Sequence, residues 1–151
     1  DKAMLEFMRL TGYNFELALF IEEMNSITNV TRLSETDFAL VFTSGIKPFV
    51  SEAVSGPTEK FVHLYGARAH HMAFNTVHIE DTCAALGRDG LKYLIDLVGS
   101  EREGLKQTFT VPSKRTLLVN EYIYRYGDFD GFFTRSNVSA LTEASGNIPA
   151  D

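Results

Sequence analysis

A histidine and a glutamate in two apolar segments could together hold a metal ion. His71 lies near the start of residues 69–76 (AHHMAFNT), and Glu121 lies in the middle of residues 117–124 (LLVNEYIY). A carboxylate inside so apolar a segment costs free energy unless something compensates its charge, and a metal ion is one such compensation. Imidazole and carboxylate ligands on neighbouring strands form part of the facial triad that holds non-haem iron. The pair therefore indicates metal chemistry if the two segments are adjacent strands.

The composition is that of a soluble globular protein. The 151 residues are 44% hydrophobic and 23% charged, which provides enough apolar material for a core. A net charge of −6 argues against a nucleic-acid surface, and no apolar run is long enough to span a membrane. The single cysteine, Cys83, excludes an internal disulfide and fits a reducing, cytoplasmic compartment. Its place on a predicted helix makes it a core residue rather than a nucleophile.

The elements that must position His71 and Glu121 follow from hydrophobic periodicity. In the first half we expect strands over residues 3–8, 27–33, 38–43 and 47–54, with a helix over 15–24. A linker at residues 55–58 and a short helix over 58–65 lead into the second half. There the pattern predicts strands over residues 69–76, 91–97, 105–111 and 116–124, with a helix over 80–86. A loop at 127–131 and a helix over 137–144 complete the chain.

The predicted order is strand, helix and three strands, twice over. Lys2 and His71 are 69 residues apart, as are Glu52 and Glu121, which suggests an internal duplication. We therefore predict an α+β fold of two βαβββ modules that form a half-open barrel, with a C-terminal helix and a ligand pocket between the modules. The predicted divisions are a first module at 1–56, a linker helix at 57–68, a second module at 69–126 and a C-terminal loop and helix at 127–151. Because the chain opens with Asp1 rather than Met, we also expect a further domain upstream.

Four segments of the chain resemble, in order, signatures of the 4-hydroxyphenylpyruvate dioxygenase family, which belongs to the vicinal oxygen chelate superfamily. The segments are residues 69–76, residues 104–110 (GLKQTFT), residues 118–125 (LVNEYIYR) and residues 131–141 (GFFTRSNVSAL). Each motif alone is unspecific, whereas four in the correct order make a chance match improbable. The resemblance covers most of residues 38–145.

The resemblance implies an Fe(II) enzyme that acts with O2 on a 2-oxo acid or a similar chelating small molecule. His71 and Glu121 would be iron ligands, and Gln107 and Phe109 would face the substrate through an amide hydrogen bond and ring stacking. Further substrate-binding positions implied by the motifs are Ser51, Phe132 and Asn137.

The chain departs from the family pattern at several positions. Lys2 aligns with the third ligand, which is a histidine in that family, and an ammonium group cannot replace a neutral imidazole. Ser51 replaces an asparagine, Pro57 replaces a glutamine, and His70 replaces the glutamine before the ligand histidine.

Two other functions stay open. The chain could be a non-catalytic ligand-binding or scaffold domain, in which Lys2 pairs with Glu121 in place of a metal. It could also be a lyase or isomerase of the same superfamily, with Glu52 as an additional ligand. Exposed sheet edges in a paired-module protein are compatible with a homodimer.

Overall fold

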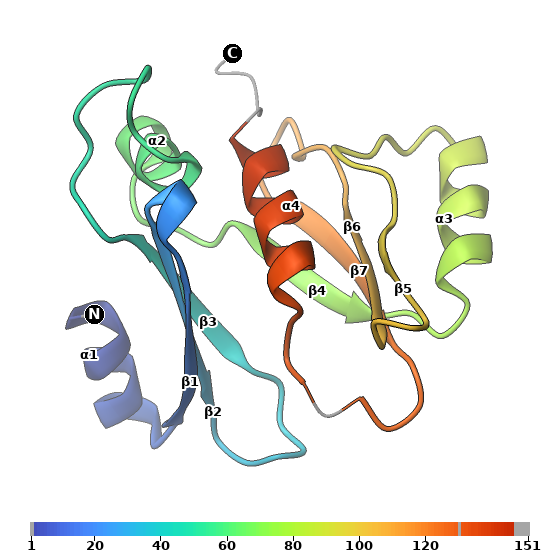
Figure 1. Ribbon diagram of the computed structural model, residues 1–151, viewed down its shortest axis with the longest axis horizontal. Helices are drawn as coiled ribbons and strands as arrows, with labels where there is room; N and C mark the ends of the chain where they lie inside the picture. Colours follow the sequence, from blue (N-terminus) through green and yellow to red (C-terminus); the bar gives the residue numbers. More distant parts are fainter. Residues whose placement is uncertain (1, 130, 147–151) are drawn as a thin grey trace. The chain divides into compact units, whose positions relative to one another are not determined.

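The computed structural model describes residues 2–129 and 131–146, which form two units. The first unit ends at His63 and the second begins at Leu64. Each unit has its own sheet, three-stranded in the first and four-stranded in the second (Figure 1). The predicted α+β class and the C-terminal helix are confirmed.

The first unit is an antiparallel sheet preceded and followed by a helix. Its elements are α1 (Lys2–Thr11), β1 (Asn14–Ile21), the 3₁₀ turn η1 (Glu22–Met24), β2 (Ser26–Arg32), β3 (Leu40–Gly45) and most of α2 (Pro57–Tyr65). The strands lie in the order β1-β2-β3, and both pairs are antiparallel. Asn25 closes the β1–β2 hairpin with a φ of 53°, a left-handed conformation that asparagine adopts more readily than most residues.

The second unit is a four-stranded sheet in which the first strand is parallel to the last. Its elements are β4 (His71–Asn75), α3 (Ile79–Arg88), β5 (Val98–Ser100), β6 (Leu105–Phe109), β7 (Val119–Arg125) and α4 (Arg135–Ser145). The strands lie in the order β4-β7-β6-β5. The β4–β7 pair is parallel, and the other two pairs are antiparallel.

Helices α3 and α4 lie against opposite faces of this second sheet. Successive side chains of a strand point to opposite faces. Lys106 of β6 contacts Glu80 of α3, whereas the next residue, Gln107, contacts Asn137 of α4. The α4 face contains the core cluster of Phe109, Val119 and Leu141, against which Leu94, Ile95 and Val98 pack.

Two predicted elements at the start of the chain were wrong. Residues 3–8 are helical instead of extended, because the helix continues to Thr11 through good helix formers and ends at Gly12, which has a φ of 79°. Residues 15–21 are a strand instead of a helix. Their apolar residues fit a helical spacing at 17, 20 and 21 but also alternate at 15, 17, 19 and 21, and pairing with β2 selects the strand.

Two further predicted strands are missing from the described residues. Residues 47–54 form no strand, consistent with Pro48, which lacks the N–H that a ladder needs. Residues 91–97 contribute a single bridge, Tyr93 to Thr110, and the short strand β5 begins after them at Val98.

The predicted repeat of 69 residues was also wrong. The first residues of α1 and α3, Lys2 and Ile79, are 77 residues apart, and those of β2 and β6, Ser26 and Leu105, are 79 apart. The structural counterpart of Lys2 is therefore the start of α3 and not His71. Glu52 lies in a turn, whereas Glu121 lies in β7. The two coincident spacings thus do not reflect the fold.

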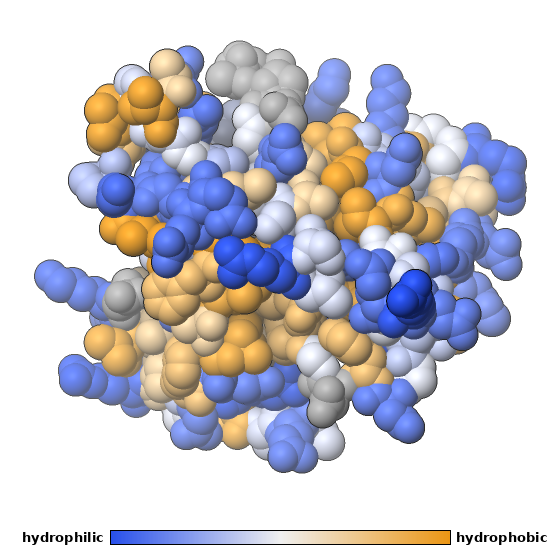
Figure 2. Space-filling model, in the orientation of Figure 1, coloured by the Kyte–Doolittle hydropathy of each residue, from blue (hydrophilic) through white to orange (hydrophobic). Residues whose placement is uncertain are grey.

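Large apolar side chains are exposed in both units. Figure 2 shows broad apolar areas between polar ones on the visible face. Phe38 is 78% exposed in the first unit, and Met72 and Phe74 of the edge strand β4 are 53% and 44% exposed in the second. Within the part of the chain that the structure describes, no helix is long and apolar enough to cross a membrane.

Candidate functional site

The second sheet brings His71 and Glu121 together on its α4 face. In the parallel ladder His71 is paired with Val119 and Ala73 with Glu121, so the histidine and the glutamate lie diagonally on the same face of adjacent strands. The distance from His71 Nε2 to Glu121 Oε2 is 3.3 Å. The side chain of His71 is 31% exposed and that of Glu121 is 3% exposed. The pair is therefore accessible from the histidine side and closed on the carboxylate side.

Burial shifts the pKa values of the two groups in opposite directions. Desolvation lowers the pKa of His71 to about 4. Desolvation also raises the pKa of Glu121 to about 7, although a hydrogen bond from Gln107 and the charge of Arg125 act against this rise. Because the pKa of His71 lies well below neutral pH, the imidazole is neutral in the folded protein, and the contact is not an ion pair.

A divalent cation fits between these two side chains. Bond lengths of about 2.0–2.2 Å place two nitrogen or oxygen ligands of one ion roughly 3.0–3.5 Å apart, a range that includes the observed 3.3 Å. A neutral imidazole has the free lone pair that a metal requires, and a cation would compensate the buried carboxylate. Within residues 2–129 and 131–146, however, no group of three or more His, Cys, Asp or Glu side chains could hold a metal. His71 and Glu121 thus provide two ligands of a set.

A chain of two amide side chains leads from the carboxylate of Glu121 to helix α4. Gln107 Nε2 donates a hydrogen bond to Glu121 Oε1, and Asn137 Nδ2 donates to Gln107 Oε1 at 3.0 Å. All three side chains are buried, with 0% exposure for Gln107 and 2% for each of the other two. The backbone of Asn137 is fixed in turn, since its N–H donates to Thr134 Oγ1 at the start of α4. This chain of hydrogen bonds connects the C-terminal helix to the candidate metal ligand.

Phe109 is a core residue that also contacts the candidate ligand. It is 4% exposed, and its ring centroid lies 4.9 Å from that of His71 with an interplanar angle of 40°. The ring therefore fixes one side of the imidazole. Substrate contact for Gln107 and Phe109 stays a prediction, and so does substrate contact for Asn137.

The remaining predicted residues belong to other elements of the fold. Phe132 packs edge-on against Phe133, with Arg125 5.3 Å above its ring, in the loop before α4. Ser51, Lys2 and Glu52 all belong to the first unit. Lys2 is exposed on α1, so the expectation that it begins a strand equivalent to β4 was wrong. The backbone N–H of Ser51 donates to Ser55 Oγ at 3.2 Å.

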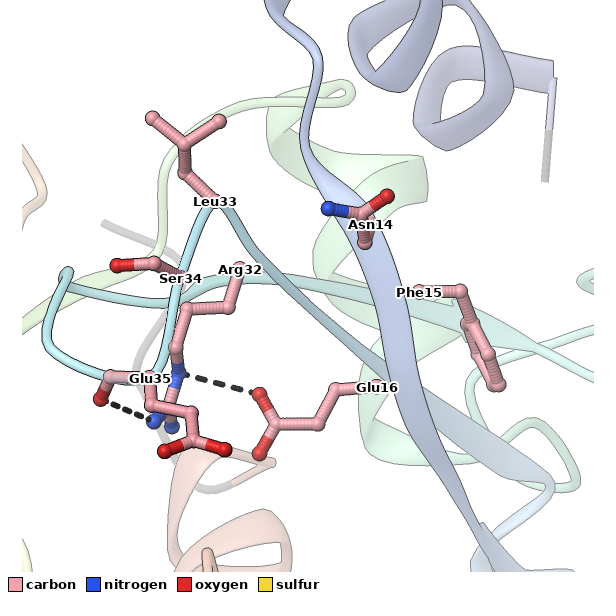
Figure 3. A pocket seen from close by; sticks show the side chains of 7 residues that line it. All are labelled: Asn14, Phe15, Glu16, Arg32, Leu33, Ser34 and Glu35. Atoms are coloured by element: carbon pink, nitrogen blue, oxygen red, sulfur yellow. Dashed lines mark hydrogen bonds and ion pairs between the residues drawn. The ribbon is translucent and has the colours of Figure 1, made fainter.

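The first unit has a surface pocket without comparable chemistry. It has a volume of about 310 Å3 and lies where β1 begins and β2 ends (Figure 3). Arg32 Nε contacts Glu16 Oε2 at 3.1 Å, and Arg32 also donates to the carbonyl oxygen of Glu35. The guanidinium of Arg32 thus already has partners within the protein, and we assign no function to this pocket. It is lined by Asn14, Phe15, Glu16, Arg32, Leu33, Ser34 and Glu35.

One contact at the site was not predicted. His70 Nδ1 lies 2.9 Å from His71 Nδ1, and desolvation, with a smaller contribution from the neighbouring His71, lowers the pKa of His70 to about 4. The sequence feature from which this contact could have been predicted is the adjacent pair of histidines. Strand alternation would have placed them on opposite faces, but His70 precedes the first residue of β4 and escapes that rule.

Comparison with known proteins identifies the fold. No protein-family model matches the chain, and no curated protein sequence matches it either. Among solved structures, the hypothetical protein BH1468 from Bacillus halodurans C-125 has a TM-score of 0.64 at 14% identity, covering 86% of this chain and 88% of that one. A methylmalonyl-CoA epimerase in complex with methylmalonyl-CoA and NH4+ has a TM-score of 0.61 at 22% identity, covering 82% and 85%. The methylmalonyl-CoA epimerase from Mycobacterium tuberculosis has a TM-score of 0.62 at 10% identity, covering 83% and 81%.

These similarities establish a class of fold. The chain has the vicinal oxygen chelate fold, as the sequence motifs predicted. At these identities the likeness shows the fold alone, and it does not support the narrower resemblance to 4-hydroxyphenylpyruvate dioxygenase.

Proposed function

We propose that this protein is a divalent-metal enzyme whose substrate is a small molecule that chelates the metal through oxygen atoms. The observation that carries the proposal is the pairing of His71 Nε2 and Glu121 Oε2 at 3.3 Å on adjacent strands of one sheet face. The fold and the names of its structural neighbours, which include methylmalonyl-CoA epimerases, support an enzyme of this general kind.

In this proposal each residue of the cluster has a separate task. His71 and Glu121 bind the metal, which when bound supplies a Lewis acid for the substrate oxygens. Gln107 holds Glu121 Oε1 by a hydrogen bond and leaves Oε2 directed at the histidine. Phe109 packs against His71 and fixes its ring plane. The exposed side of His71 is the side from which a substrate can approach.

For the chemistry we favour an Fe(II) dioxygenase that acts on a 2-oxo acid. The sequence motifs around His71, Gln107 and Glu121 support this choice, because one histidine and one carboxylate are two of the three ligands of a facial triad. A facial triad leaves three coordination positions open, enough for a bidentate 2-oxo acid and O2.

A metal-dependent epimerase is the second candidate. It is favoured by the structural neighbours, several of which are named methylmalonyl-CoA epimerase. Such a reaction would move a proton at a carbon next to a carbonyl group and would need no O2. The two candidates thus differ in a measurable co-substrate.

The first experiment is elemental analysis of the protein purified anaerobically with Fe(II). We expect one first-row metal ion for each polypeptide chain, lost in His71→Ala and retained in His78→Ala. His78 is a matched control because it precedes α3 and its side chain makes no capping hydrogen bond there. Absence of metal from the unmodified protein would refute the proposal and would favour a non-catalytic ligand-binding domain instead.

A second measurement separates the two chemistries. The metal-loaded protein is mixed with a panel of 2-oxo acids while O2 is recorded, and with 2-methyl-branched acyl thioesters in D2O. O2 consumption that requires His71 supports the dioxygenase. Deuterium incorporation without O2 consumption would replace the dioxygenase by the epimerase.

A further inference from the structure

We propose that His70 is a positioning residue that fixes His71 in the tautomer required for metal binding. The inference rests on the proposed function in so far as His71 is a metal ligand. Its starting point is the short contact between His70 Nδ1 and His71 Nδ1, which are 2.9 Å apart. Two ring nitrogens at this distance are joined by one proton, because two lone pairs facing each other would repel.

The direction of this hydrogen bond follows from the other nitrogen of His71. Nε2 faces Glu121 Oε2 at 3.3 Å, where it must present a lone pair to bind a cation shared with the carboxylate. A neutral imidazole carries one proton, so a lone pair at Nε2 places that proton on Nδ1. His71 Nδ1–H is then the donor and His70 Nδ1 is the acceptor.

The packing around the two rings keeps this arrangement in place. The rings are almost perpendicular, at 88°, and both contact Phe109, with centroid distances of 5.9 Å for His70 and 4.9 Å for His71. The carbonyl of His70 accepts a hydrogen bond from Val119 N at 3.0 Å, which extends the β4–β7 ladder by one residue. The backbone and the ring of His70 are therefore both anchored to the core.

The chemical consequence is a better metal ligand. A histidine that donates its second N–H to an acceptor is held in one orientation, and its ligating nitrogen becomes more basic. Loss of such a partner typically costs 10–100-fold in metal affinity. Each of the two proposed ligands thus has its own supporting side chain, His70 for His71 and Gln107 for Glu121.

The test compares two substitutions of His70, one that keeps a hydrogen-bond acceptor and one that removes it. His70→Gln keeps an acceptor oxygen within reach of His71 Nδ1, whereas His70→Leu removes the acceptor and keeps an apolar side chain against Phe109. Two quantities are measured for each variant and for the unmodified protein. One is the Zn2+ dissociation constant by competition with a chelator, and the other is the tautomer of His71 in the metal-free protein by 15N NMR of the imidazole.

We expect His71 to carry its proton on Nδ1 in the unmodified protein and in His70→Gln. In His70→Leu we expect the Nε2–H tautomer to become populated and the Zn2+ dissociation constant to rise 10–100-fold. Equal tautomer populations and equal affinities in His70→Leu and the unmodified protein would overturn the inference. If His70→Leu does not fold, His70→Phe, which also lacks an acceptor but fills more of the space of the imidazole, takes its place.

The outcomes also separate this inference from the proposed function. If the unmodified protein binds no Zn2+ and no Fe(II), the proposed function fails, while the NMR measurement still decides whether His70 sets the tautomer. If the metal binds equally well in all variants, the proposed function stands and His70 is only a core residue.

Discussion

The two units of this protein repeat the same elements but not the same chemistry. Each has a helix, an antiparallel three-stranded sheet and a second helix, and the second unit has β4 in addition. Aligning Thr28 with Gln107 in the two ladders places Val30 at Phe109 and Val41 at Glu121. The position of the buried carboxylate in the second unit is therefore apolar in the first. The comparison shows that the fold alone does not create the site, which requires β4 and a set of polar residues that support Glu121.

The helices that follow the two sheets differ in the same way. Glu59 and Asn137 both lie three residues after the residue that precedes their helix, Gly56 or Thr134. The carboxylate of Glu59 turns back and accepts a hydrogen bond from Gly56 N at 2.6 Å. Asn137 instead reaches across to Gln107. A capping residue in one unit thus corresponds to a link to the candidate site in the other.

Substitution of Gly99 should break the second unit most severely. A Cβ at Gly99 would lie 2.0 Å from the carbonyl oxygen of Leu105 and 2.7 Å from Asn137 Nδ2, and its φ is 89°. Overpacking against backbone and a positive φ together cost roughly 3–5 kcal/mol, so we expect Gly99→Ala to lower the free energy of unfolding by about that amount. Urea denaturation measures the loss.

The control for this prediction is Gly90→Ala. Gly90 also has a positive φ, 94°, but a Cβ there meets nothing within 4 Å. We expect a loss of only about 1–2 kcal/mol, from backbone strain alone. Equal losses at the two glycines would show that Asn137 and Leu105 move aside without cost, contrary to the close packing of α4 described above.

The equivalent residues Gln107 and Thr28 test whether the polar cluster belongs to one unit. Gln107→Leu removes the partner of Glu121 and of Asn137 at once, and each buried unpaired group costs about 1–3 kcal/mol. We expect a loss of about 3 kcal/mol in the free energy of unfolding. Thr28→Val removes only the 3.2 Å contact with Thr43, and we expect about 1 kcal/mol or less. Thermal or urea unfolding of both variants measures the two losses. A larger loss of unfolding free energy for Thr28→Val than for Gln107→Leu would contradict the prediction.

The sequence specified the second unit more fully than the first. The segments with His71 and Glu121 were predicted as strands, and both are strands that pair with each other. Residues 3–8 and 15–21 were assigned the wrong type because short apolar segments fit both periodicities and only the tertiary context selects between them. The hydrogen bonds of His70 and Asn137 could not be predicted, because they depend on a residue just outside a strand and on how α4 docks. Local patterns thus revealed the two candidate ligands but not the residues that orient them.

The pH dependence of stability should report the histidine pair of the second unit. Between about pH 4 and 6.5, His70 and His71 bind fewer protons in the folded than in the unfolded protein, so each makes the free energy of unfolding rise with pH. Between 4.5 and about 7, Glu121 binds more protons when folded, so its contribution falls with pH. Because two histidines act against one glutamate, the unfolded protein binds about one proton more than the folded protein between pH 4.5 and 6.5. The free energy of unfolding therefore rises by at most about 1.4 kcal/mol for each pH unit.

Replacing one histidine isolates that slope. In metal-free His70→Gln the contributions of His71 and Glu121 nearly cancel. We therefore expect the free energy of unfolding to rise less steeply between pH 4.5 and 6.5 than in the unmodified protein, by the amount that one bound proton contributes. Urea denaturation at four pH values in that window measures it, with His78→Gln as the control. An unchanged slope in His70→Gln would mean that His70 is protonated in the folded protein, and the neutral hydrogen bond to His71 would then be wrong.

The smallest expected effect concerns the cap that fixes Asn137. Thr134 Oγ1 accepts a hydrogen bond from Asn137 N at 3.3 Å, and loss of such a cap costs about 1 kcal/mol. We expect Thr134→Ala to lower the free energy of unfolding by about that amount and Thr134→Ser to leave it nearly unchanged. If α4 positions Gln107 and through it Glu121, Thr134→Ala should also weaken Zn2+ binding slightly, by less than the loss expected for His70→Leu. A loss of stability with no change in Zn2+ affinity would confine Thr134 to the helix cap and would separate the start of α4 from the candidate metal site.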